Sequence, residues 1–214
     1  MKQIIRKTSL YYLWRNWMVK RKQLKKLVEW ERNGKPGPPP HIVKQRILQD
    51  YSQKFGLKVL VETGTFEGDM VEAMKNLFDK IYSIELLKEN FEKAKKRFQR
   101  NRHIEIIWGD SGKELGKIMK IISQPALFWL DGHYSGKNTA KGEEITPIYR
   151  ELEHIFSSRN LGHVIVIDDA RCFGTNSNYP TIEALKKYIR SKRKNVQITV
   201  AEDSIRITPG HIDN

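Results

Sequence analysis

The chain has 214 residues, of which 39% are hydrophobic, so it can bury one full core and is expected to form one catalytic-sized domain plus an appendage. It has no apolar run of about 18 or more residues and no signal-peptide pattern at its N-terminus. Its single cysteine excludes an internal disulfide framework and a multi-cysteine zinc site. A cytoplasmic location is the simplest interpretation.

The net charge of +14 is concentrated near the N-terminus. Residues 1–48 contain 13 Lys or Arg against two Glu, a net of +11, whereas the remaining residues contain 26 basic and 23 acidic side chains, a net of +3. Strong positive charge can indicate binding to nucleic acid. Here it belongs to the N-terminal segment, and the body of the chain is nearly balanced.

Residues 1–32 are predicted to form a basic amphipathic helix. Within residues 8–30, apolar side chains recur at helical spacing with Lys and Arg between them; they are Leu10, Trp14, Trp17, Leu24 and Val28, and Arg21 interrupts the stripe. We expect this stripe to dock on its own domain or on a second copy in a homo-oligomer. Peripheral contact with an anionic membrane ranks second. Nucleic acid ranks third, because no recognised binding motif accompanies the charge.

Residues 33–40, NGKPGPPP, are predicted to be a linker, because four prolines and two glycines disfavour both helix and sheet. Residues 41–214 then form the main domain. It opens with a short helix at 41–55, whose apolar residues follow one another at i, i+4 spacing: Val43, Ile47, Tyr51 and Phe55.

From residue 57 onward, strand-like and helix-like segments alternate. Apolar, β-branched runs indicate strands at 57–61, 81–84, 104–108, 126–130 and 164–167, and VQITVAEDSIRIT indicates two more, joined by a turn. Helices are expected between them, one beginning near Lys113 and one with Thr146 as N-cap and Pro147 as its first residue. This order predicts the α/β class: a Rossmann-like, doubly wound, mostly parallel sheet with a C-terminal antiparallel hairpin.

Acidic residues stand at the C-terminal end of every predicted parallel strand: Glu62, Glu85, Asp110, Asp131 and the pair Asp168–Asp169. Right-handed crossovers place these ends along one edge of the sheet, where ligands of such folds bind. A ligand site at this edge is one explanation. Capping of the following helix or loop is the other, and it stays open for Glu85, for Asp110 with Ser111, and for the Asp168–Asp169 pair.

Gly64 and Gly68 follow the first strand in the stretch ETGTFEGD. They let the backbone turn tightly and approach a ligand before the next helix begins, although a tight turn without a ligand needs glycine as well. The stretch lacks the G-x-G-x-x-G pattern of a dehydrogenase turn. Glu85 lies 17 residues after Gly68, near the place where dinucleotide-binding folds put an acid on a ribose hydroxyl.

Together these residues resemble the class I S-adenosylmethionine-dependent methyltransferases, over residues 41–210. The resemblance rests on the E-x-G-x-x-x-G turn, the acid after the second strand and the G-D-S after the third. It implies a seven-stranded sheet and S-adenosylmethionine as cofactor. The residues that it assigns to the cofactor are Glu62, Gly64, Thr65, Phe66, Gly68, Glu85, Asp110, Ser111 and Asp131.

Two further stretches, LDGHY and VIVIDDA, narrow the resemblance to the macrocin-type, divalent-metal-dependent O-methyltransferases that act on sugars in natural products. Asp131, Asp168 and Asp169 match the positions of that family's metal ligands. His133 departs from the family motif, which more often has a second acid there. The resemblance therefore implies Mg²⁺ or Mn²⁺ and a small-molecule acceptor, such as a sugar or sugar phosphate.

The chemistry of the acids supports the same site. Three converging carboxylates raise one another's pKa, and a hard cation such as Mg²⁺ or Mn²⁺ removes that repulsion. The cation lowers the pKa of a bound hydroxyl, and Asp131 or His133 is expected to be the catalytic base that accepts its proton. A capping role for the acids and a structural role for the histidine are the alternatives.

Two loops are expected to enclose the acceptor. The first, SGKNTAKGEE at 135–144, has Lys137 and Lys141 available for an anionic group, although an ordinary solvated loop has the same composition. The second is 171–180, in which Cys172 is expected to be partly buried and inert.

The sequence thus predicts an S-adenosylmethionine-dependent O-methyltransferase acting on a sugar-like or other small-molecule hydroxyl. One alternative is an RNA methyltransferase with the N-terminal helix as its substrate arm, but no N-P-P-Y motif follows the fourth strand. Another is a non-catalytic nucleotide-binding module. The acceptor itself has no signature, because substrate-binding loops share no general pattern.

Overall fold

A computed structural model describes residues 9–132 and 146–210. Its helices are α1 (Ser9–Arg32), α2 (His41–Phe55), α3 (Asp69–Met74), α4 (Lys88–Phe98), α5 (Ser111–Met119), α6 (Ile148–Ser157) and α7 (Ile182–Lys192), with a 3₁₀ turn, η2 (Ala170–Cys172). Its strands are β1 (Val59–Thr63), β2 (Lys80–Glu85), β3 (Ile104–Trp108), β4 (Ala126–Leu130), β5 (Val164–Ile167), β6 (Val196–Ala201) and β7 (Ser204–Pro209).

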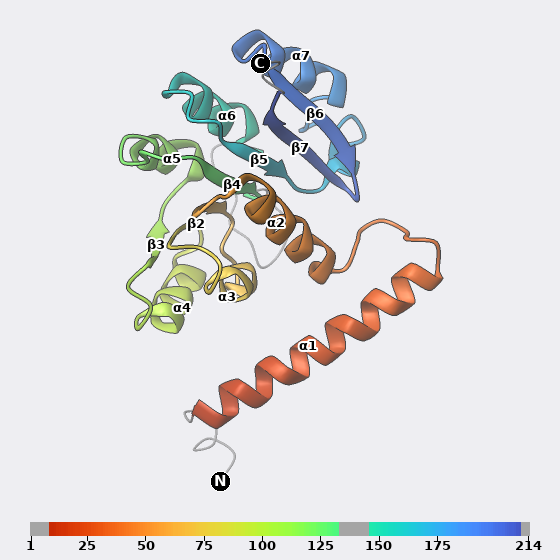
Figure 1. Cartoon of the computed structure of the whole chain (residues 1–214), viewed down its shortest axis with the longest axis vertical. Coiled ribbons are helices and arrows are strands. Elements are labelled where there is room, and N and C mark those ends of the chain that lie inside the picture. Colours follow the sequence, from red (N-terminus) through yellow and green to blue (C-terminus); the bar gives the residue numbers. More distant parts are fainter. Residues whose placement is uncertain (1–8, 133–145, 211–214) are drawn as a thin grey trace.

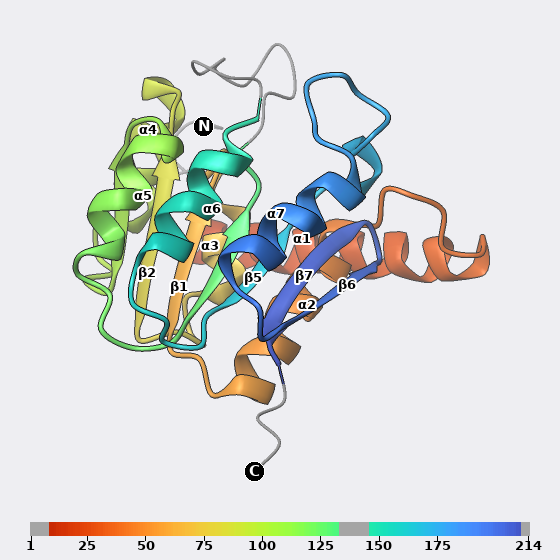
Figure 2. The same cartoon turned by 90° about the horizontal axis from the view of Figure 1, so that it is seen from above.

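The described strands form one seven-stranded sheet in the order β3-β2-β1-β4-β5-β7-β6 (Figure 1). The first five in chain order pair in parallel. β7 runs antiparallel to β5 and to β6, which forms one edge of the sheet (Figure 2). The predicted doubly wound, mostly parallel sheet with a C-terminal antiparallel hairpin is confirmed.

Helices cover both faces of the sheet, and the strands alternate their side chains between the two cores. Phe128 of β4 packs in the core formed with α5, α6 and α7, and its neighbour Trp129 packs in the core formed with α2 and α3. Both side chains are almost fully buried. Because β4 and β5 are buried on both faces, they read as continuous apolar runs in the sequence.

Several expected boundaries differ from the structure; for example, β2 spans Lys80–Glu85 rather than 81–84, and β1 ends at Thr63 rather than at residue 61. β1 begins at Val59 rather than at residue 57, because the N–H of Leu57 still bonds to the Ser52 carbonyl at the end of α2. α5 begins at Ser111, earlier than expected. α6 begins at Ile148, because Pro147 has the backbone angles of a cap residue (φ −81°, ψ 9°). Each difference is two residues or fewer and leaves the topology unchanged.

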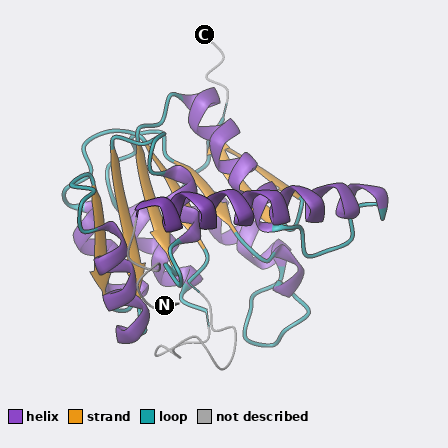
Figure 3. Cartoon of the chain, turned by 90° about the horizontal axis from the view of Figure 1, so that it is seen from below, coloured by secondary structure: helices purple, strands orange, loops and turns teal. Residues whose placement is uncertain are grey.

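α1 is a long helix that crosses the body of the molecule and projects beyond it (Figure 3). Leu27 and Trp30 are buried against α2 and the core beneath it. Leu24 and Val28, the residues of the expected stripe whose side chains are described, face solvent instead and are 40% and 53% exposed. The expectation that this stripe docks on its own domain is therefore not met by these two residues.

The segment from 33 to 40 forms neither helix nor strand, as its composition predicts. The indole Nε1 of Trp30 donates a hydrogen bond of 2.6 Å to the carbonyl of Pro36, which ties the linker back to α1. Within the described ranges, no helix has the length and apolar composition needed to cross a membrane.

Candidate functional site at the strand tips

The C-terminal tips of β1, β4 and β5 lie side by side. The N–H of Asp131 donates to the Thr63 carbonyl at 3.1 Å, and the N–H of Asp168 donates to the Leu130 carbonyl at 3.0 Å. The strand order reverses between β1 and β4, so the crevice for a ligand in a doubly wound sheet opens at this point. The residues predicted from strand ends therefore meet where such a fold binds its ligand.

Asp131, Asp168 and Asp169 form a cluster that we call the acid triad. Each offers a carboxylate oxygen, and these atoms all lie within 4.8 Å of one another. Asp168 is 3% exposed, and its Oδ1 has no hydrogen-bond partner within the described part of the chain. The predicted convergence of the three acids is thus present in the fold.

Two cations that the sequence analysis did not single out accompany the acid triad. Lys44 of α2 donates to Oδ2 of Asp168, and its Nζ lies 3.6 Å from Oδ1 of Asp169. Nη1 of Arg171 lies 2.7 Å from the same Oδ1 and also pairs with Asp203, in the turn between β6 and β7. The acids are therefore enclosed by positive charge from two elements.

Burial and charge act against each other in this cluster. Burial raises the pKa of Asp168, and the neighbouring Asp169 raises it further, while Lys44 opposes both. Burial alone would lower the pKa of Lys44, but its pKa is raised because Asp168, Asp131 and Asp169 together favour the ammonium form. The site as it stands is thus a buried, partly neutralised group of carboxylates.

The glycine turn after β1 packs directly against the acid triad. Gly64 has φ +89°, and a Cβ there would lie 2.6 Å from the carbonyl oxygen of Asp131. Gly68 has φ +75°, and a Cβ there would lie 2.7 Å from the Phe98 ring. Both positions therefore need glycine for the backbone angle and for the space.

Glu85 fixes the tip of this turn. Its two carboxylate oxygens accept hydrogen bonds from the N–H of Phe66 at 2.7 Å and from the N–H of Leu87 at 2.8 Å. Phe66 has φ +48°, which is unusual for a residue with a side chain, and it is 45% exposed. Glu85 is buried rather than solvated, and its bond to Leu87, which precedes α4, leaves the capping alternative open.

Glu62 and Thr65 lie below the turn, joined through Ser83. The Ser83 hydroxyl donates to Oε2 of Glu62, and the hydroxyls of Thr65 and Ser83 are 2.5 Å apart. Glu62 is 1% exposed, and burial raises its pKa to about 8. These two buried side chains tie the turn and the end of β1 to Ser83 of β2 from inside the protein.

Asp110 caps a helix, as the alternative for it proposed. Its Oδ1 accepts a 2.8 Å hydrogen bond from the N–H of Gly112, in the first turn of α5. Ser111 is the first residue of that helix and is buried. Capping uses one carboxylate oxygen of Asp110, so it is compatible with a second role for this residue.

Several predicted site residues lie outside the described residues: His133, and the loop 135–144 with Lys137 and Lys141. The second expected loop, 171–180, follows the acid triad directly. Burial raises the pKa of Tyr179 in that loop, and the negative charges of Asp169 and Asp131 raise it further. Cys172 is half-buried as expected, and burial raises the pKa of its thiol.

Lys44 was missed because it belongs to no strand tip. The expected apolar face of α2 consisted of Val43, Ile47, Tyr51 and Phe55, which leaves position 44 on its margin. Leu48, one turn after Lys44, is fully buried, so the buried face is broader on that side. If Leu48 as well as Ile47 had been assigned to the core, the helical spacing would have placed Lys44 on the side of α2 that faces the sheet.

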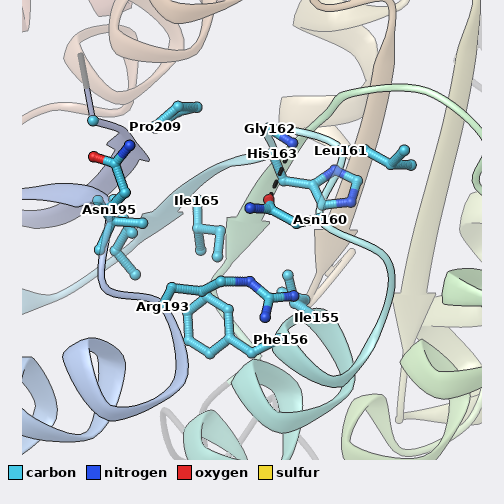
Figure 4. Close-up of a pocket in the computed structure, with 13 residues that line it drawn as sticks. Ile155, Phe156, Asn160, Leu161, Gly162, His163, Ile165, Arg193, Asn195 and Pro209 are labelled. Carbon is cyan, nitrogen blue, oxygen red and sulfur yellow. Dashed lines mark hydrogen bonds between the residues drawn. The ribbon is translucent and has the colours of Figure 1, made fainter. Parts of the chain in front are cut away.

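A hollow lies at the opposite end of the parallel strands, near the start of β5 (Figure 4). It has a volume of about 360 Å³, and the described residues that line it include Phe156, His163 and Arg193 but no Asp or Glu. Nδ1 of His163 accepts a hydrogen bond from the N–H of Ala126 at 3.1 Å. This hollow has size but lacks the paired acids and the glycine turn of the other end.

The sequence matches no model of a protein family and no curated protein. Solved structures are similar. The O-methyltransferase from Bacillus cereus, solved with S-adenosylhomocysteine, has a TM-score of 0.56 and 17% identity over 89% of this chain and 91% of that chain. TomG from Streptomyces achromogenes, an O-methyltransferase of tomaymycin synthesis solved with S-adenosylmethionine, has a TM-score of 0.56 and 16% identity over 88% and 89% of the two chains.

A protein from Clostridium thermocellum that is assigned as an rRNA methylase has a TM-score of 0.52 and 14% identity, over 74% of this chain and 91% of that chain. Acceptors of different kinds thus occur on this fold, and the fold does not select among them. At such identities the likeness concerns the fold. This chain has the fold of the class I S-adenosylmethionine-dependent methyltransferases.

Proposed function

We propose that this chain is an S-adenosylmethionine-dependent O-methyltransferase that methylates a hydroxyl of a sugar-like or other small molecule, assisted by Mg²⁺ or Mn²⁺. The acid triad supports the proposal most strongly. It lies beside the glycine turn, at the point where the strand order reverses. A cofactor held by the turn and a hydroxyl held by the acids would therefore meet.

The donor atoms of the acid triad fit a hard divalent cation. All three side chains offer carboxylate oxygen, the ligand that Mg²⁺ and Mn²⁺ prefer. Oδ1 of Asp168, buried and without a hydrogen-bond partner among the described residues, is an acceptor whose burial is costly unless something binds it. Asp131, Asp168 and Asp169 would hold the cation, and the cation would lower the pKa of the acceptor hydroxyl.

The chain's own residues would do the rest. Gly64, Phe66 and Gly68 would present backbone groups to the cofactor, which supplies the methyl group, while Glu85 keeps the tip of the turn in place. Glu62 and Thr65 would act from beneath by shaping the turn, and Asp110 and Ser111 would border the same pocket at the start of α5. Asp131 would accept the hydroxyl proton on a carboxylate oxygen, with His133 as the other candidate base.

The role of α1 stays a prediction. The exposed Leu24 and Val28 lie on a helix that also exposes Arg21, Lys22, Lys25 and Lys26. Contact with a second copy of the chain remains the first expectation, and contact with an anionic membrane the second.

Asp168→Asn tests the proposed function. The substitution keeps the shape of the side chain but removes the charge that a cation needs, so we expect Mg²⁺-dependent methylation of a panel of sugars to fall by about 100-fold or more. Binding of S-adenosylhomocysteine, measured by calorimetry, should stay within about threefold of wild type, because Asp168 lies outside the glycine turn.

Asp50→Asn is the matched control, since Asp50 is exposed on α2, and it should leave both measurements unchanged. Unchanged methylation in Asp168→Asn would remove the cation mechanism and leave the methyltransferase assignment standing.

A further inference from the structure

Lys44 differs from the other residues at the strand tips because it comes from α2, a helix that precedes the sheet in the chain. Its side chain is 15% exposed and crosses toward the acid triad past Trp129, whose ring centre lies 6.0 Å from Nζ. At its end the ammonium donates to Oδ2 of Asp168 and lies near Oδ1 of Asp169. A fixed positive charge thus stands among the three carboxylates.

A divalent cation would bind the same carboxyl groups, and at Asp168 it could take Oδ1 only beside the ammonium on Oδ2. The ligand atoms of the acid triad lie within 4.8 Å of one another, close to the ~4.2 Å between opposite oxygens around one Mg²⁺ ion. An ammonium already bonded to Asp168 occupies one of these carboxylates. Two positive groups in so small and buried a volume would repel each other strongly, because the protein interior screens charge poorly.

We propose that Lys44 is a built-in competitor for the divalent cation: its ammonium offsets part of the charge of the acid triad in the cation-free protein, and the cation binds only as Lys44 leaves Asp168. The inference rests on the cation site of the proposed function. Lysine suits this role, because its ammonium is a point charge on a flexible four-carbon stem that can swing away. α2 thereby sets the cation affinity of a site that the sheet builds.

A purely structural Lys44 would have the opposite effect on the cation. If the ammonium served only to hold the carboxylates in place, its removal would let the acids separate and would weaken cation binding. If it competes, its removal leaves Asp168 without its ion pair, while Arg171 still pairs with Asp169, and strengthens cation binding. The direction of the change in affinity therefore separates the two roles.

The test is a calorimetric titration of the full chain with Mn²⁺, with S-adenosylhomocysteine present. We expect Lys44→Met to bind Mn²⁺ at least about tenfold more tightly than wild type. Lys44→Arg retains the charge and should stay weak. Lys54→Met, which removes an exposed lysine from the same helix, is the matched control and should stay within about twofold of wild type.

Equal or weaker Mn²⁺ binding by Lys44→Met overturns the inference alone. If neither the wild type nor any of the three variants binds Mn²⁺, the inference is overturned and the cation is removed from the proposed function. Binding of S-adenosylhomocysteine tests the methyltransferase assignment separately. Should Lys44→Met be folded but too unstable for calorimetry, thermal melts decide: Mn²⁺ must raise its Tm more than that of wild type, and an equal rise contradicts the inference.

Discussion

The two ends of the parallel strands differ in their chemistry. At the C-terminal tips, buried acids gather beside a turn with positive φ angles, and burial raises the pKa of Glu62 to about 8. At the other end, a hollow of about 360 Å³ is lined mainly by apolar groups, and burial, with help from Arg193, lowers the pKa of His163 to about 4. The C-terminal tips thus bury carboxyl groups, which bind cations when they are ionised, whereas the opposite end buries the neutral imidazole of His163.

The comparison teaches that chemistry, rather than the size of a hollow, identifies the site. A hollow needs converging polar groups to fix a ligand. The strand tips have them, because parallel strands end together and because the order reversal between β1 and β4 leaves a crevice there. The opposite end of the strands belongs to the same sheet, but the helix ends and loops that line its hollow bring no acidic side chains there.

Glu62→Gln should give the largest difference in stability. Burial raises the pKa of Glu62 from 4.5 to about 8, so the folded protein holds a proton that the unfolded chain loses. Stability from this proton is complete below pH 4.5 and is lost as the pH rises through 8. Glutamine stays neutral, so the variant should gain on the order of 3–5 kcal/mol relative to wild type between about pH 4 and pH 9.

Urea unfolding of both proteins across this pH range measures the difference. Glu92→Gln, at an exposed position of α4, is the control and should follow wild type. Parallel pH profiles for Glu62→Gln and wild type would mean that Glu62 is ionised when buried, contrary to the account of the turn given above.

A matched pair of glycines gives the next effect. Gly64 at the strand tips and Gly162 near the opposite end both have positive φ, +89° and +79°. Alanine at either costs about 1–2 kcal/mol in backbone strain. Gly64→Ala also meets the Asp131 carbonyl at 2.6 Å, whereas Gly162→Ala meets nothing closer than 3.8 Å, so Gly64→Ala should lose about 1–3 kcal/mol more.

Calorimetry with S-adenosylhomocysteine sharpens the comparison. We expect Gly64→Ala to bind it at least about tenfold more weakly than wild type and Gly162→Ala to bind it as wild type does. Equal destabilisation and equal affinity in the two variants would show that the strand tips have no special link to the ligand.

Most of the fold was predictable because its strands are rich in apolar residues. β4 and β5, buried on both faces, read as uninterrupted apolar runs, and the boundaries of β3, β4 and β5 match the structure. The start of β1 was misplaced because Leu57 is apolar and buried yet bonds to the end of α2, and an apolar pattern does not distinguish these roles. Within α1, Leu27 and Trp30 rather than Leu24 and Val28 face the domain, which helical spacing alone could not decide.

The site was predictable where it depends on strand ends. The convergence of Asp131, Asp168 and Asp169 follows from parallel strands that end at one edge. Lys44 and the Arg171–Asp203 pair reach the same place from a helix and a hairpin far away in the chain, and their arrival depends on tertiary packing. Such contacts carry no periodic signal in one sequence.

The most direct test of the methyltransferase assignment is calorimetric titration of the wild-type chain with S-adenosylhomocysteine, with and without Mg²⁺, and with NAD as the control ligand. We predict saturable one-to-one binding of S-adenosylhomocysteine and none of NAD. A folded protein that binds no S-adenosylhomocysteine under either condition would contradict the assignment.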